Sequence, residues 1–102
     1  MGFQTVTKVS DTEPGKITLH EVNGVSIALC NVNGSFYAID DVCTHDGGPL
    51  DQGDLEGNLV ECPRHGAKFD VTTGKAVVLP AVKPVATYPA QVEGDDVMVD
   101  VA

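Results

Sequence analysis

The sequence predicts an all-β protein, and three observations support that prediction. Short apolar runs alternate with polar residues at the two-residue period of a β-strand. No stretch shows the periodicity of a convincing three-turn helix. Turn signals of two residues separate the apolar runs, at Asn23-Gly24, Asn33-Gly34, Gly57-Asn58 and Gly94-Asp95.

The strands beside these turns are expected to form the base of the fold. Asn-Gly accepts positive φ at both central positions, as a tight hairpin turn requires. Because alternate residues of a strand point to the same side, three apolar faces can be read from the sequence. They are Ile17 with Leu19, Val25 with Ile27 and Leu29, and Val97 with Val99 and Val101. We therefore expect strands from both ends of the chain to meet in one base.

Prolines interrupt the pattern in the second half of the chain. Pro80 and Pro84 lie in a stretch of about residues 79–84, and neither can donate to a sheet ladder. This stretch is therefore predicted to be a stiff loop that returns to the main sheet. Pro89 predicts that the strand after it is a sheet edge or carries a bulge. With 102 residues, we expect one domain spanning 1–102.

Residues 41–74 differ from the rest because they hold two Cys/His pairs. The first is Cys43-Thr44-His45, and the second, sixteen residues later, is Cys62-Pro63-Arg64-His65. Each pair supplies one thiolate and one imidazole, so four metal ligands converge if the two loops face each other. Glycines follow both pairs, and they allow backbone N–H groups to approach sulfur closely, which tunes iron–sulfur centres.

The ligand types favour a [2Fe–2S] cluster but leave a structural zinc site open. Three cysteines cannot supply four thiolates, whereas two Cys and two His also suit Zn²⁺. Zinc fingers usually pair like with like, and here each loop mixes the two types. Such mixed loops are expected if each iron of a cluster binds two ligands of the same type, one from each loop. The third cysteine, Cys30, is predicted to be a structural free thiol on a strand.

The spacing C-x-H and C-x-x-H resembles the Rieske motif. Gly-Gly-Pro-Leu follows the first pair, a proline lies inside the second, and the similarity continues through residues 55–58, 65–70 and 73–74. The sequence is most similar to the ferredoxins of bacterial aromatic-ring-hydroxylating dioxygenase systems. This resemblance implies the Rieske fold, an antiparallel β-sandwich base with a small inserted cluster-binding lobe at about 41–74. It also implies one [2Fe–2S] cluster, with Cys43 and Cys62 on a buried iron and His45 and His65 on an outer iron.

The resemblance also implies a function in aromatic hydrocarbon catabolism. Such ferredoxins are one-electron carriers and not enzymes, and they pass electrons from a flavin-dependent reductase to a terminal oxygenase. The alternative is a Rieske ferredoxin or small subunit serving another oxidoreductase, such as nitrite reductase or iron–sulfur assembly. Many nitrite reductase small subunits have lost the ligands, and this chain keeps all four.

Four positions place the chain on the low-potential branch of that family. High-potential members carry a disulfide between cysteines at the positions of Gly48 and Arg64. They also tend to carry Ser and Tyr where this chain has Ala67 and Phe69, and those hydroxyls bond towards cluster sulfur and a cysteine ligand. Without these donors, we expect a potential near the low end of the Rieske range, roughly −150 mV.

The composition is strongly acidic, with 15 Asp and Glu against 6 Lys and Arg, a net charge of −9. Such a surface would repel a phosphate backbone, so nucleic acid is not an expected partner. The charge serves either solubility or steering towards a basic partner. Asp46, Asp51 and Asp54 near the first loop form either a solvated rim or a docking surface. With no membrane-length apolar run and no leader signal, we expect a cytoplasmic monomer.

Overall fold

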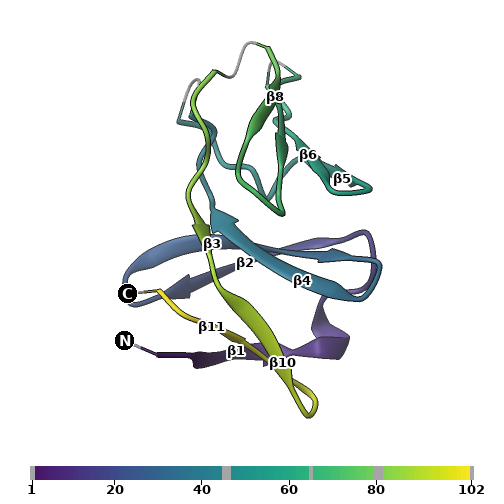
Figure 1. Ribbon diagram of the computed structural model, residues 1–102, viewed down its shortest axis with the longest axis vertical. Coiled ribbons are helices and arrows are strands. Elements are labelled where there is room, and N and C mark those ends of the chain that lie inside the picture. Colours follow the sequence, from purple (N-terminus) through teal and green to yellow (C-terminus); the bar gives the residue numbers. More distant parts are fainter. Residues whose placement is uncertain (1, 45–46, 65, 80–81, 102) are drawn as a thin grey trace.

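The fold consists of three antiparallel sheets. The computed structural model describes residues 2–44, 47–64, 66–79 and 82–101. From bottom to top in Figure 1, the strand orders are β1-β11-β10, β2-β3-β4-β9 and β5-β6-β7-β8. The helical residues among those described form one 3-10 turn, η1 (Val9–Asp11). The all-β antiparallel prediction is therefore confirmed.

The lower sheet joins the two ends of the chain. Its central strand β11 pairs with β1 on one side and with β10 on the other, which confirms the expected meeting of the termini. Lys8 of β1 forms an ion pair with Asp96 of β11 at 3.1 Å. The three strands are β1 (Gln4–Lys8), β10 (Ala90–Glu93) and β11 (Asp96–Val99).

The middle sheet is built from two hairpins with the predicted Asn-Gly turns. Asn23 and Asn33 have φ of 52° and 51°, and each is followed by a glycine with positive φ. These conformations give the tight turns that join β2 to β3 and β3 to β4. The strands are β2 (Ile17–Val22), β3 (Val25–Val32), β4 (Ser35–Asp40) and β9 (Thr87–Tyr88).

The upper sheet lies between β4 and β9 in the sequence and forms, with its loops, what we call the cluster lobe (residues 41–78). Gly57-Asn58 makes the predicted turn between its first two strands. The lobe's strands are β5 (Asp54–Glu56), β6 (Leu59–Glu61), β7 (Lys68–Asp70) and β8 (Ala76–Val78).

Successive side chains of β3 point to opposite faces of its sheet and pack into two separate cores. Ile27 and Leu29 pack in a lower core between the two base sheets, with Val97 and Val99 of β11. Ala28, on the opposite side of β3, packs in an upper core with residues of the cluster lobe. The upper core contains Ala28, Cys30, Ile39, Cys43, Leu50, Val60, Cys62, Ala67, Phe69, Val71 and Val85. The lobe is thus bound to the base by shared apolar contacts.

The Pro89 prediction is confirmed, and the predicted proline loop agrees with the structure where it is described, although Pro80 and Ala81 lie outside the described residues. The described residues between β8 and β9 form no strand. Pro89 separates β9 of the middle sheet from β10, which is an edge strand of the lower sheet. Among the described residues, no helix is long and apolar enough to cross a membrane.

Candidate metal centre

The loop that begins at Cys43 is closed by two backbone hydrogen bonds. The N–H of Cys43 donates to the carbonyl of Gly48 at 2.7 Å, and the N–H of Gly47 donates to the carbonyl of Cys43 at 2.7 Å. Gly47 has a φ of +77°, a conformation that a glycine adopts at little cost.

The loop that begins at Cys62 repeats this construction. The N–H of Cys62 donates to the carbonyl of Ala67 at 2.7 Å, and the N–H of Gly66 donates to the carbonyl of Cys62 at 3.1 Å. Gly66 also has a φ of +77°. The same offsets of four and five residues therefore close both loops, so the two cysteines occupy equivalent positions.

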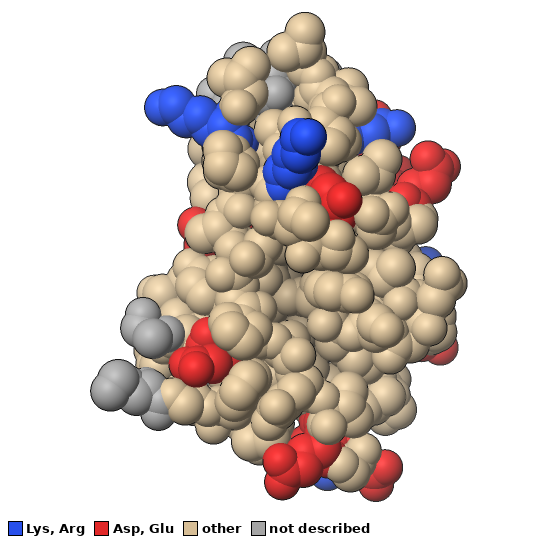
Figure 2. Space-filling model, viewed as in Figure 1, with Lys and Arg blue, Asp and Glu red and all other residues tan. Residues whose placement is uncertain are grey.

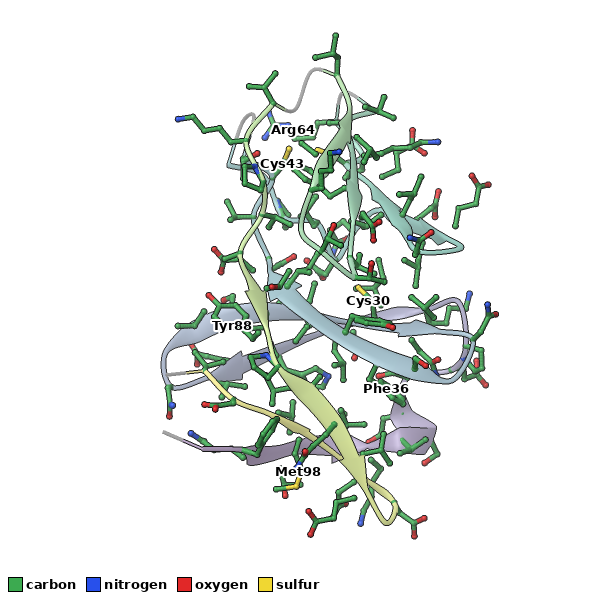
Figure 3. The ribbon with its side chains drawn as sticks, viewed as in Figure 1. Cys30, Phe36, Cys43, Arg64, Tyr88 and Met98 are labelled. Carbon is green, nitrogen blue, oxygen red and sulfur yellow. The ribbon has the colours of Figure 1, made fainter. Side chains whose placement is uncertain are left out.

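Both cysteines are buried and neither forms a disulfide. Cys43 is 0% exposed and Cys62 is 1% exposed, and both belong to the upper core. Figure 3 shows Cys43 and Arg64 in the upper part of the lobe and Cys30 near its junction with the base. Cys30 is also fully buried, but it lies within β3, and burial raises the pKa of its thiol to about 12.

The other two predicted ligands, His45 and His65, lie outside the described residues, as does Asp46. Within the described part of the chain, no group of three or more His, Cys, Asp or Glu side chains forms a metal site. The four-ligand set therefore stays a prediction. The two thiols fit a [2Fe–2S] cluster in which each iron binds two ligands of the same type, one from each loop. The two equivalent loops would supply the two sulfur ligands of one iron.

Asp41 fastens the first loop to the end of β4. Its Oδ1 accepts hydrogen bonds from the N–H of Leu50 at 2.9 Å and of Asp51 at 2.7 Å. Its own N–H donates to the carbonyl of Ser26 in β3 at 3.0 Å. Burial, together with the side-chain contact to Asp51, raises the pKa of Asp41. No sequence pattern singled out this residue, because its partners lie nine and ten positions away.

The proline loop is fastened to the same region. The Thr44 hydroxyl donates to the carbonyl of Lys83 at 2.7 Å. The N–H of Val85 donates to the carbonyl of Gly74 at 2.8 Å, and a Cβ on Gly74 would overlap the Val85 carbonyl oxygen. These contacts, which join residues distant in sequence, hold Lys83 beside Thr44 and Val85 beside Gly74.

Two of the three acidic residues near the first pair line a cleft, and the third, Asp46, lies outside the described residues. Asp51 and Asp54 line a cleft of about 480 Å³ between the lobe and the base. Lys16 of the base and Lys68 of the lobe also line it. The two carboxylates therefore lie in a cleft that is lined by both signs of charge.

The described residues thus place one buried thiol at the start of each of two matching loops. Comparison with known proteins defines the class further. A model of the Rieske [2Fe–2S] domain matches residues 2–89. The chain belongs to the Rieske [2Fe–2S] domain family, which confirms the family resemblance and the type of cofactor.

Individual relatives are carriers named for their oxygenase systems. The ferredoxin component of biphenyl 2,3-dioxygenase from Rhodococcus jostii is 43% identical, over 98% of this chain and 94% of the relative. The 3-phenylpropionate/cinnamic acid dioxygenase ferredoxin subunit of Escherichia coli K12 is 46% identical, over 90% of this chain and 87% of the relative. A chain in a complex of reduced oxygenase and oxidized ferredoxin in carbazole 1,9a-dioxygenase has a TM-score of 0.89 and 35% identity, and the match covers 95% and 91% of the two chains.

Proposed function

We propose that this protein carries single electrons from a flavin-dependent reductase to a terminal aromatic-ring oxygenase. The observation that carries the proposal is the pair of buried thiols, Cys43 and Cys62, at equivalent positions of two matching loops. Relatives over nearly the whole chain are named as ferredoxin components of dioxygenase systems, which supports the oxygenase as acceptor. The reductase, the monomeric state and the cytoplasmic location are parts of the same proposal.

When bound, a [2Fe–2S] cluster supplies a one-electron couple. The chain's own residues would hold and shield it. Cys43 and Cys62 would bind one iron, and His45 and His65 would bind the other. The two cysteines lie in the upper core, which also contains the fully buried Phe69 and Leu50. Backbone hydrogen bonds within the protein close each loop. The chain is an electron carrier within an oxygenase system and not itself a catalyst.

Metal and sulfide analysis tests the cofactor directly. Protein purified from its native host should contain two irons and two acid-labile sulfides per chain, with visible absorption that bleaches on reduction. His45→Ala and His65→Ala should each abolish that spectrum. Cys30→Ala is the matched control, and it should keep the spectrum because Cys30 lies within β3 and not in a loop. Stoichiometric zinc without labile sulfide would contradict the proposal.

Reconstitution tests the route of the electron. The purified protein should couple NADH oxidation by a flavin-dependent ring-dioxygenase reductase to substrate hydroxylation by a terminal oxygenase from the same genome. Omitting the protein should stop hydroxylation. An intact cluster that no such oxygenase can oxidise would reject the acceptor while leaving the cofactor established.

A further inference from the structure

The turn between β3 and β4 contains a chemically reactive pair of residues. Asn33 and Gly34 are both exposed, and they have φ of 51° and 94°. In an Asn-Gly sequence the backbone nitrogen of the glycine can attack the side-chain amide carbon of the asparagine. A glycine favours this attack because it has no side chain to obstruct the approach. The turn therefore has the chemistry needed for spontaneous modification.

A buried side chain holds the nitrogen that would attack. The N–H of Gly34 donates to Oδ1 of Asn31 at 2.7 Å. Asn31 is only 2% exposed, and with Thr12 it is one of two buried polar residues in the described part of the chain. Its Nδ2 donates in turn to the carbonyl of Thr12 at 2.7 Å. Both ends of the Asn31 amide are thus bonded, and its oxygen is fixed towards Gly34.

The equivalent turn between β2 and β3 is held by a different contact. There Nδ2 of Asn23 donates to the carbonyl of Val101 at 3.0 Å. This hydrogen bond restrains the side chain of the asparagine and does not involve the nitrogen of Gly24. The two turns share the Asn-Gly sequence, the exposure and the positive φ. Each is therefore an internal control for the other.

Water reaches the turn between β3 and β4. Gly34 lines a surface groove of about 370 Å³ between the start of β4 and β10. Residues 31–37 contain no Asp, Glu, His, Lys or Arg, and in Figure 2 uncharged surface forms much of the middle of the molecule. No such side chain of this segment can take the proton from the Gly34 nitrogen. Release of that proton to water therefore depends on the hydrogen bond to Asn31.

We propose that Asn33 is a site of deamidation through a succinimide, and that the buried side chain of Asn31 controls the rate by holding the Gly34 N–H. In the first step the Gly34 nitrogen loses its proton to water or hydroxide and forms a bond to Cγ of Asn33. The Cγ–Nδ2 bond breaks, and Nδ2 takes up a proton and leaves as ammonia. Water then opens the ring at either carbonyl, which gives aspartate or isoaspartate at position 33. The site is independent of the electron-carrier function.

The isoaspartate product would damage the hairpin that leads to the metal centre. In isoaspartate the main chain runs through the side-chain carbon, so the turn gains one backbone atom. Val32 and Ser35 are paired directly across this turn, and a tight two-residue turn fixes the register of its strands. Because β4 leads to the loop that begins at Cys43, the bond from Gly34 to Asn31 protects the strand that positions this loop.

Peptide mapping of the holoprotein tests the control by Asn31. Each variant is kept in mildly alkaline buffer, and conversion of each asparagine is followed by mass spectrometry. Asn31→Ala should accelerate deamidation of Asn33 about five- to tenfold, the effect of losing one hydrogen bond, and should change that of Asn23 less than about twofold. Hydrogen exchange of the Gly34 amide should accelerate by a similar factor, because both reactions require release of the same N–H. Equal acceleration at Asn23 and Asn33, or none at Asn33, would overturn the proposal.

Two further variants separate the hydrogen bond from the stability of the fold. Asn31→Asp keeps an oxygen that can accept the Gly34 N–H but loses the donor to Thr12, so Asn33 should react within about twofold of its original rate. Val97→Ala weakens the lower core, and it should leave the rates at both asparagines unchanged while the protein stays folded. Reaction of Asn31→Asp as fast as that of Asn31→Ala would reject the role of the acceptor. Acceleration by Val97→Ala would show that global unfolding sets the rate.

The unfolded chain provides the last reference. In concentrated urea, Asn33 should deamidate at the same rate in Asn31→Ala as in the original protein, because the bond to Gly34 exists only in the fold. A difference in urea as large as the difference in buffer would assign the effect to local sequence and reject control by the folded side chain.

Discussion

Cys30, Cys43 and Cys62 are all buried in one apolar core and form no disulfide, yet only two of them are predicted ligands. Cys30 lies inside β3, where its neighbours are paired with β2 and β4 and its sulfur faces packed side chains. Cys43 and Cys62 each begin a loop, so their sulfurs lie where the chain turns. Burial alone therefore does not distinguish a ligand from a structural thiol, and the local backbone does.

Ala67 and Phe69 are also important at the scale of single residues, because they belong to the core that contains Cys43 and Cys62. Both are 0% exposed, and the Ala67 carbonyl accepts the N–H of Cys62. We expect Ala67→Ser and Phe69→Tyr each to raise the reduction potential, provided that the new hydroxyl donates to sulfur and stabilises the reduced state. Protein-film voltammetry measures the change, and the double variant should lie higher within the Rieske range of roughly −150 to +300 mV.

Two controls accompany that measurement. Ala67→Val and Phe69→Leu change the packing without adding a donor, and their potentials should stay close to the original value. A wild-type potential well above zero, or equal shifts for Ser and Val at position 67, would show that hydroxyl donors do not explain the low potential.

At the scale of secondary-structure elements, glycines allow two segments of backbone to approach each other closely. Gly53 lies just before β5, and a Cβ there would overlap the carbonyl oxygen of Glu61 in β6. Gly74 approaches Val85 in the same way and brings the proline loop to the lobe. In both places glycine is needed because another backbone occupies the space of a side chain.

Gly53→Ala should therefore destabilise the fold by about 3 kcal/mol, since a backbone oxygen cannot rotate away from the added carbon. Gly94→Ala is a suitable control, because Gly94 has φ +64° but open space around it, and strain alone should cost about 1 kcal/mol. Chemical denaturation of the holoprotein measures both values. Equal losses for the two variants would mean that the crowding at Gly53 relaxes at little cost.

At the scale of the whole molecule, the described residues form two cores, and we expect them to depend on the metal site differently. The lower core packs between the base sheets and contains none of the predicted ligands. The upper core contains Cys43 and Cys62 and joins the lobe to β3 and β4. The division into a base and a cluster lobe (residues 41–78) thus leads to a prediction about stability as well as about shape.

Removal of the iron tests this division. In the apoprotein, amides of β5 to β8 should exchange hydrogen at least about tenfold faster than in the holoprotein, because the ligands no longer hold the two loops together. Amides of β2 to β4 that face the lower core should change much less. Hydrogen exchange followed by mass spectrometry measures both regions. Uniform acceleration along the chain would show that base and lobe unfold as one unit.

Local chemistry was sufficient to predict much of this protein. Each two-residue turn, such as Asn23-Gly24, depends on the φ preferences of its own residues, and Pro89 marks an edge strand because it lacks a donor. The Cys/His spacing likewise predicted a metal centre, and the resemblance carried by that spacing predicted the [2Fe–2S] cluster, because ligand types and short loops are properties of contiguous sequence. His45 and His65 remain predicted ligands.

Only the tertiary structure brought distant residues together. Asp41 reaches Leu50, and Thr44 reaches Lys83, across separations that no periodic pattern encodes. Composition yielded the net charge of −9 but not its distribution, and the fold places Asp51 and Asp54 in a cleft with Lys16 and Lys68. The physical reason is that hairpins and ligand motifs are decided by neighbouring residues, whereas surface potential and loop anchoring depend on which distant segments the sheets place side by side.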